Sequence, residues 1–146
     1  MKKKFELGVT NGCFDLLHKG HLYSLEQAKK YCKILIVLLN SDSSVKKIKG
    51  KNRPIQNQQI RKKRLLKTRY VDKVIIFEET TPLKKIKLIK PNVIFKGLEY
   101  KNKSISGKIF LEKNGGKVIL LKRLKKISTT KIINEKKIKA NNNIFI

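Results

Sequence analysis

Short apolar runs alternate along the chain with stretches in which apolar residues recur every three or four positions. The runs have the length and the β-branched content of strands. The second run is apolar almost throughout, as expected of a parallel strand buried on both faces. The predicted strands cover residues 5–10, 33–39, 72–77, 91–95 and 117–121.

The intervening stretches predict helices. In the first of them Leu22, Leu25 and Ala28 fall on one helical face. Ser128 has the side chain of a helix N-cap, so a last helix is predicted to begin there. The other predicted helices cover residues 21–31, 58–68, 82–90 and 107–114, and the polar segments 41–57 and 96–106 are predicted to be loops.

Strands that alternate with helices predict an α/β fold, in which a parallel five-stranded sheet carries helices on both faces. The 146 residues suit one domain. We expect that domain to cover residues 1–138 and the low-complexity end, 139–146, to be a flexible tail. Ligands of such sheets bind beyond the carboxyl ends of the strands, so candidate site residues should follow those ends.

Membrane and secretory signals are missing from the sequence. No apolar run approaches the roughly 20 residues that cross a bilayer, and the N-terminus lacks the apolar stretch of a signal peptide. Cys13 and Cys32 are too few for a disulfide framework and are expected to be reduced thiols. These features predict a cytoplasmic protein that does not associate with membranes.

The formal net charge of +27 raises the question of nucleic-acid binding. Arginine occurs only at positions 53, 61, 64, 69 and 123, and lysine supplies the rest of the 37 basic residues. Abundant lysine, isoleucine and asparagine are what drift in an AT-rich genome produces, so we attribute the excess mainly to composition. The field would still attract phosphorylated small molecules. Without a nucleic-acid motif, specific nucleic-acid binding is not expected, and a basic nucleic-acid-binding module is the remote alternative.

A dense group of polar residues follows the first predicted strand. Gly12 allows a ligand to approach the backbone closely. His18 and His21 open the next helix on one side, where free amides and the helix dipole favour an anion. A metal site would need further ligands nearby, and these are the only two histidines. Phosphate binding is therefore preferred over a metal site and over two histidines with only a core role.

The segment His18-Lys19-Gly20-His21 resembles the HxGH signature of the cytidylyltransferase-like superfamily. The longer run over residues 10–18, TNGCFDLLH, is more specific than HxGH alone. A second block, ISTTKI at residues 127–132, resembles the C-terminal ISTTxI motif of the same family. The resemblance covers about residues 5–138 and implies a Rossmann-like fold and a nucleotidyltransferase.

Within that superfamily the middle of the chain resembles the adenylyltransferase domains of ADP-heptose synthases, through residues 40–42, 49–50, 53–55, 77–82, 96–97 and 115–118. That branch implies transfer of AMP from ATP to D-glycero-β-D-manno-heptose 1-phosphate, giving ADP-heptose and pyrophosphate for lipopolysaccharide synthesis. It also implies Mg²⁺ as cofactor, small-molecule substrates as partners, and a homodimer.

Two residues depart from the branch. Glu99 stands where the usual Lys-Gly-x-Asp-Tyr segment has aspartate. Arg123 lies five residues before Ser128, a feature that resembles glycerol-3-phosphate and ethanolamine-phosphate cytidylyltransferases. The alternative is therefore a CTP-dependent enzyme that acts on glycerol 3-phosphate or a similar phosphorylated alcohol or sugar.

The chemistry needs no protein nucleophile, because an acceptor phosphate is already anionic, and catalysis then consists of positioning and charge stabilisation. The resemblance implies a catalytic set of His18, His21, Lys46 and Thr129. The implied nucleotide-binding set is Thr10, Asn11, Gly12, Cys13, Phe14, His18, His21, Lys49, Gly97, Arg123, Ser128, Thr129 and Thr130. The implied acceptor-binding set is Asp15, Lys46, Arg61, Lys96, Glu99 and Tyr100. Mg²⁺ is expected to bind through phosphate oxygens, with no side-chain ligand.

Overall fold

The structure is a computed structural model and describes residues 5–122. The predicted last helix and tail, together with Arg123 and Ser128 to Thr130, lie outside the described residues, so those expectations stay predictions. The proposed domain boundary at residue 138 stays a prediction for the same reason.

Five strands form one parallel sheet in the order β3-β2-β1-β4-β5. The strands are β1 (Phe5–Gly12), β2 (Cys32–Asn40), β3 (Lys73–Phe77), β4 (Val93–Gly97) and β5 (Lys117–Leu121). This confirms the predicted five-stranded α/β fold. From β1 the chain adds β2 and β3 on one side and then β4 and β5 on the other side. The strand order therefore reverses between β1 and β4, and their carboxyl ends form the switch point at which such sheets bind ligands.

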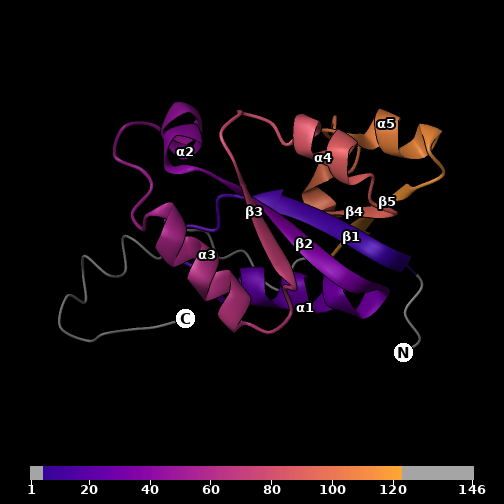
Figure 1. The fold of residues 1–146 in the computed structure, drawn as a ribbon, viewed down its shortest axis with the longest axis horizontal. Coiled ribbons are helices and arrows are strands. Elements are labelled where there is room, and N and C mark those ends of the chain that lie inside the picture. The colour runs from indigo at the N-terminus through magenta and orange to yellow at the C-terminus, as the bar shows by residue number, and fades with distance from the viewer. Residues whose placement is uncertain (1–4, 123–146) are drawn as a thin grey trace.

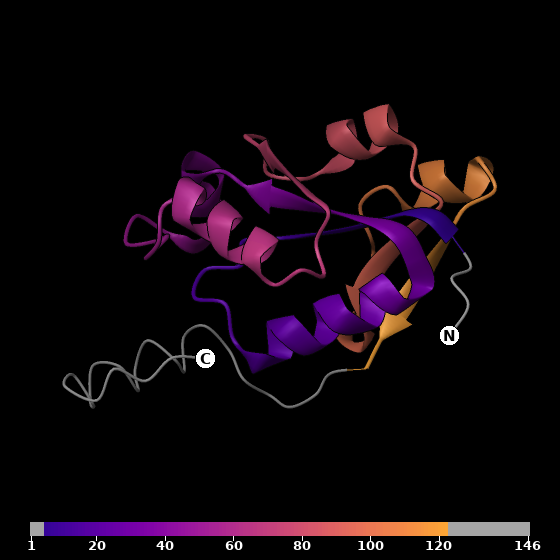
Figure 2. The same ribbon diagram turned by 60° about the horizontal axis from the view of Figure 1, so that its bottom comes forward.

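Helices cover both faces of the sheet (Figures 1 and 2). Figure 2 shows α1 on one side of the strands and α4 and α5 on the other. The helices are α1 (Lys19–Tyr31), α2 (Asp42–Lys49), α3 (Gln58–Lys67), α4 (Leu83–Ile89) and α5 (Lys108–Lys113), with a 3₁₀ turn, η1, at Leu98–Tyr100.

Alternate residues of β2 pack in two separate apolar clusters, because successive side chains of a strand point to opposite faces of the sheet. Leu35 and Val37 pack in the cluster that contains Leu25 of α1 and Leu65 of α3. Ile36 and Leu38 pack on the opposite face, with Ile86 of α4 and Leu111 of α5. The continuous apolar run of β2 therefore reflects burial on both faces.

The prediction of a loop over residues 41–57 was wrong for its first part, which forms α2. The Ser41 hydroxyl caps this helix by accepting a hydrogen bond from the Ser44 amide at 3.1 Å. Val45 is the one apolar side chain that α2 buries, so the sequence has no repeating apolar face to indicate a helix. The predicted loop at 96–106 likewise begins inside β4 and includes η1.

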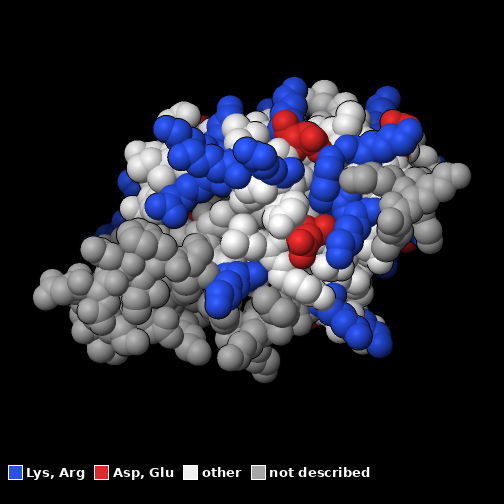
Figure 3. All heavy atoms as spheres, turned by 90° about the horizontal axis from the view of Figure 1, so that it is seen from below, with Lys and Arg blue, Asp and Glu red and all other residues white. Residues whose placement is uncertain are grey.

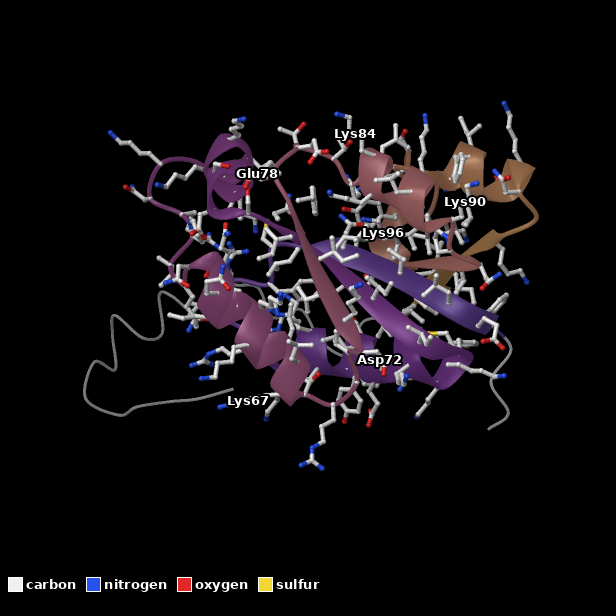
Figure 4. The ribbon with its side chains drawn as sticks, viewed as in Figure 1. Lys67, Asp72, Glu78, Lys84, Lys90 and Lys96 are labelled. Carbon is white, nitrogen blue, oxygen red and sulfur yellow. The ribbon has the colours of Figure 1, made fainter. Side chains whose placement is uncertain are left out.

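Glu78, which directly follows β3, holds the start of α2 in place through hydrogen bonds. Its Oε2 accepts hydrogen bonds from the hydroxyls of Ser41 at 3.0 Å and Ser43 at 2.6 Å. These bonds, chiefly the one from Ser43, hold the pKa of the Glu78 carboxyl below its usual value. Glu78 and Asp72 lie at opposite ends of β3, and Glu78 lies beside α2 (Figure 4).

A buried arginine joins the loops at the carboxyl ends of the strands. The Arg61 guanidinium of α3 is fully buried and donates to the carbonyl oxygens of Cys13 at 2.9 Å, Asn40 at 2.8 Å and Gln56 at 2.8 Å. It also forms an ion pair with the Asp42 carboxylate at 2.8 Å. One side chain thus ties together the loop after β1, the end of β2, the start of α2 and the loop before α3.

Within residues 5–122 no helix combines the length and the apolar character that crossing a membrane requires.

We predict that Arg61→Met destabilises the protein by about 3–5 kcal/mol, because the change leaves three carbonyls without their donor and breaks a buried ion pair. Denaturant unfolding measures the effect. Arg64→Met is the matched control, since Arg64 is exposed on the same helix, and it should change stability by less than about 0.5 kcal/mol. Equal unfolding midpoints for the two variants would refute the structural role of Arg61.

Candidate active site

A cavity of about 390 Å³ opens at the switch point between β1 and β4. Thr10 bridges the two strands there, since its hydroxyl donates to the Phe95 carbonyl at 3.3 Å. The cavity is lined from five directions, by the end of β1 and its loop, the first turns of α1, the end of α2, the β4–η1 segment and β5. The lining residues are Thr10, Asn11, Phe14, His18, Gly20, His21, Ser24, Leu25, Ala28, Lys49, Phe95, Lys96, Gly97, Glu99, Tyr100 and Leu121.

The loop after β1 has an unusual backbone. Phe14 and Leu16 adopt φ values of 46° and 60°, in the left-handed region that side chains with a Cβ rarely occupy. The Phe14 ring lies against Gly12, where an added Cβ would be 3.0 Å from it. The same ring lies 5.1 Å from the His21 ring, measured between centroids. The strained loop therefore presents Phe14 to the cavity beside a histidine.

The two histidines form a stacked pair. Their ring centroids are 3.7 Å apart, with 18° between the planes. His18 Nδ1 accepts from the amides of Gly20 at 3.1 Å and His21 at 3.4 Å, so His18 caps α1. His21 Nδ1 accepts from the His18 amide at 3.3 Å. Because both Nδ1 atoms accept, a neutral imidazole at either position carries its proton on Nε2.

Burial keeps His21 neutral. Loss of water, the neighbouring His18 and Lys49 together lower the pKa of His21 to about 3. A neutral ring with a proton on Nε2 is a hydrogen-bond donor that does not change charge near neutral pH. His21 is thus suited to holding phosphate oxygens and not to shuttling protons.

Two lysines contribute positive charge to the cavity. Lys49 lines it from the end of α2, whereas Lys46, one turn earlier, is exposed and lies off the lining. Lys96 comes from the end of β4, and its ammonium lies 4.8 Å from the centre of the Tyr100 ring. Burial lowers the pKa of Lys96, and the Glu99 carboxylate opposes that shift.

Residue 97 has to be glycine because the Glu99 side chain occupies the space that a Cβ would need. An added Cβ at Gly97 would overlap the Glu99 carboxylate, so Glu99 folds back against the strand end. Glu99 is the one acidic side chain on the cavity lining within the described part of the chain. The Lys96–Gly97–Glu99–Tyr100 segment therefore forms one wall that combines a cation, an aromatic ring and a carboxylate.

The structure brings ten of the predicted site residues together on this lining: Thr10, Asn11, Phe14, His18, His21, Lys49, Lys96, Gly97, Glu99 and Tyr100. It places five others off the lining, namely Gly12, Cys13, Asp15, Lys46 and Arg61. Arg61 and Asp15, expected on the acceptor side, are buried among the loops and bonded to them. Thr129 and the other C-terminal candidates lie outside the described residues.

Sequence reasoning missed the contribution that α1 makes to the cavity besides His21. Gly20, Ser24 and Ala28 line it at intervals of four residues. This spacing of small residues on one helical face was the available signal. Arg53 was also missed as a partner of Asp15, although the segment 53–55 was part of the family resemblance.

Among residues 5–122, no three histidine, cysteine, aspartate or glutamate side chains come together as a possible metal site.

Comparisons with known proteins identify the family of this chain. The family model described as cytidylyltransferase-like matches residues 9–135. The bifunctional protein HldE of Nitrobacter winogradskyi is 48% identical over 127 residues, which are 87% of this chain and 26% of that protein. HldE of Hyphomonas neptunium is 46% identical, over 88% of this chain and 26% of that protein. The chain thus spans about a quarter of these relatives.

Solved structures show the same fold. The lipopolysaccharide core biosynthesis protein from Thermoplasma volcanium superimposes with a TM-score of 0.65 at 27% identity, covering 84% of this chain and 99% of that one. Pantoate-beta-alanine ligase from Francisella tularensis gives a TM-score of 0.51 at 16% identity, covering 96% and 72%, which supports the fold alone. With a family match over residues 9–135 and relatives at 46–48% identity, the chain belongs to the cytidylyltransferase-like family and is a nucleotidyltransferase.

Proposed function

We propose that this nucleotidyltransferase transfers AMP from ATP to a sugar 1-phosphate, with D-glycero-β-D-manno-heptose 1-phosphate as the acceptor and ADP-heptose and pyrophosphate as products. The stacked histidine pair at the start of α1, inside the switch-point cavity and with His21 held neutral, carries the proposal. The choice of acceptor is supported by the HldE relatives and by the Thermoplasma protein named for lipopolysaccharide core biosynthesis.

The reaction is an in-line displacement at the α-phosphorus. A phosphate oxygen of the acceptor forms the new P–O bond, and the bond from the α-phosphorus to the oxygen bridging to the β-phosphorus breaks. That oxygen leaves with its electron pair as part of pyrophosphate. The attacking oxygen is already anionic, so no general base is required, and catalysis depends on alignment and on donors that meet the developing charge.

His18 and His21 would supply those donors through Nε2, beside the first amides of α1. Lys49 would neutralise the triphosphate from the end of α2, with Lys46 one turn away. Thr129 and its neighbours would hold the far end of the triphosphate. On the acceptor side we place the wall formed by Lys96, Glu99 and Tyr100.

Mg²⁺ would enter with the triphosphate and neutralise its oxygens. Oxygen ligands suit this ion, and the described cavity offers the Glu99 carboxylate but no group of side chains that could form a cage around it. The residues thus fit an ion held by substrate phosphates. Small-molecule substrates, a homodimer and the absence of specific nucleic-acid binding stay predictions.

The first test is turnover. His18→Ala should lower the rate of pyrophosphate release from ATP and heptose 1-phosphate by about 10²-fold or more, the scale expected for loss of one preorganised donor. Lys19→Ala is the matched control, because Lys19 is the exposed residue between the histidines, and it should keep most of the activity. Pyrophosphate release that is unchanged in His18→Ala would defeat the proposed role.

The second test is substrate choice, since Glu99 replaces the usual aspartate and opens the CTP-dependent alternative. The protein is incubated with ATP or CTP and with heptose 1-phosphate or glycerol 3-phosphate, and the products are identified by mass spectrometry. We expect ADP-heptose. Product formed with CTP and glycerol 3-phosphate, and none with ATP, would replace the adenylyltransferase assignment with the alternative.

The third test is the charge of His21. Its pKa of about 3 in the folded protein lies below the ordinary value of 6.5, so below pH 6.5 the unfolded chain binds a proton that the native ring does not. The free energy of unfolding is therefore unaffected by this group above about pH 6.5. As the pH falls below that value, it decreases by up to about 1.4 kcal/mol per pH unit. His21→Gln should weaken that dependence in denaturant unfolding. A His21 ring signal in proton NMR that titrates near pH 6.5 in the wild type would show the ring to be ordinary.

A further inference from the structure

The loop between α2 and α3 is fastened to one buried carboxylate. Asp15 Oδ2 accepts from Arg53 Nε at 3.0 Å and from the Ile55 amide at 2.7 Å, and Oδ1 accepts from the Gln56 amide at 2.9 Å. The Asp15 side chain is fully buried and that of Arg53 is 14% exposed. Arg53 and Gln56 therefore hold fixed positions beside the loop that follows β1.

Two polar atoms of this cluster are buried without a hydrogen-bond partner among the residues that the structure describes. They are the Nη2 donor of Arg53 and the Oε1 acceptor of Gln56. Buried polar groups in proteins are almost always paired, and leaving a charged donor unpaired away from water is unfavourable. Arg53 bonds to Asp15 through its side chain and Gln56 through its backbone amide, so both residues that carry an unpaired atom belong to one cluster.

The cluster adjoins the cavity through the loop after β1. Asp15 directly follows Phe14, which lines the cavity, and Arg61 donates to the carbonyl oxygens of both Cys13 and Gln56. Burial raises the pKa of the Cys13 thiol, whereas the charges of Lys49, Arg61 and Arg53 act on the same thiol in the opposite direction. Lys49 also lines the cavity. Arg53 lies near Lys49 in the same turn of the chain, since the Arg53 amide donates to the Gly50 carbonyl oxygen at 3.2 Å. Arg61 already donates to three backbone carbonyls and to Asp42, whereas Arg53 keeps a side-chain nitrogen without a partner among the described residues.

We propose that Arg53 and Gln56 form the subsite that receives the phosphate and a hydroxyl group of the acceptor, next to Lys49. The proposal rests on the proposed function, which requires a second phosphorylated substrate beside the triphosphate. A guanidinium fork binds phosphate oxygens in pairs, and an amide oxygen accepts a hydrogen bond from a sugar hydroxyl. The unpaired donor and acceptor match the two kinds of group that a sugar phosphate presents.

Arg53→Lys tests the phosphate half. Lysine keeps the charge and can keep the ion pair with Asp15, but it loses the second arm of the fork. By calorimetric titration without nucleotide, affinity for mannose 1-phosphate and for methyl phosphate should fall about tenfold. Affinity for ATP and the thermal midpoint should stay unchanged. Arg64→Lys, on the exposed face of α3, is the control and should bind both probes as the wild type does.

Gln56→Met tests the hydroxyl half, because methionine has a similar shape and no amide oxygen. It should weaken mannose 1-phosphate binding several-fold and leave methyl phosphate binding unchanged, since methyl phosphate has no hydroxyl to recognise. The backbone bonds of Gln56 to Asp15 and Arg61 do not involve its side chain, so the loop should keep its fold.

The outcomes separate this subsite from the enzyme activity. Binding of the probes that depends on Arg53, in a protein that forms no nucleotide product, would support the subsite and reject the proposed reaction. An Arg53→Lys variant that binds both probes like the wild type, or that loses affinity for ATP alone, would overturn the subsite whatever the protein catalyses.

Discussion

The buried guanidinium of Arg61 is the interaction on which the site depends. Loops at the carboxyl ends of parallel strands have carbonyl groups that no neighbouring strand satisfies, and burying them without donors is costly. Arg61 satisfies three of them and neutralises Asp42 at the start of α2. The loop that leads to the histidines and the helix that ends in Lys49 are therefore held relative to one another by a single planar group.

In the site that Arg61 holds together, burial determines the charge of His21 and so the hydrogen bonds that it can make. Desolvation, the neighbouring His18 and the nearby Lys49 all disfavour a charged His21, while the bonds at both Nδ1 atoms fix the proton of a neutral ring on Nε2. A neutral His21 donor at a helix start can stabilise an anion without competing for its proton. This would suit the proposed reaction, whose nucleophile is already charged and which depends on positioning more than on proton transfer.

The parts of the molecule that are repetitive could be predicted from the sequence. Apolar runs predicted the strands, and the run at 117–121 coincides with β5, because a strand of a parallel sheet concentrates apolar residues that are consecutive in the sequence. The helix α2 has no such signal in the sequence, since Val45 is the one apolar side chain that it buries. Arg61 could not be separated from the solvated lysines and arginines around it, because burial of a charged side chain depends on acceptors that are distant in sequence, such as Cys13.

Arginine and lysine have different roles in this chain: lysine supplies surface charge, and two arginines form directional bonds inside the protein. Lysine supplies most of the positive charge, and Figure 3 shows basic side chains spread over one face with few acidic groups between them. Lysine suffices there, because a solvated charge needs no particular shape. Arg61 bonds four acceptors in fixed directions and Arg53 pairs with a buried carboxylate, and a three-donor ammonium cannot reproduce a planar fork at such positions. Arg64 and Arg69 are exposed and do not follow this division. The excess charge and the chemistry of the site are thus separate properties: the surface could lose many lysines while the two inner guanidiniums kept the loops in place.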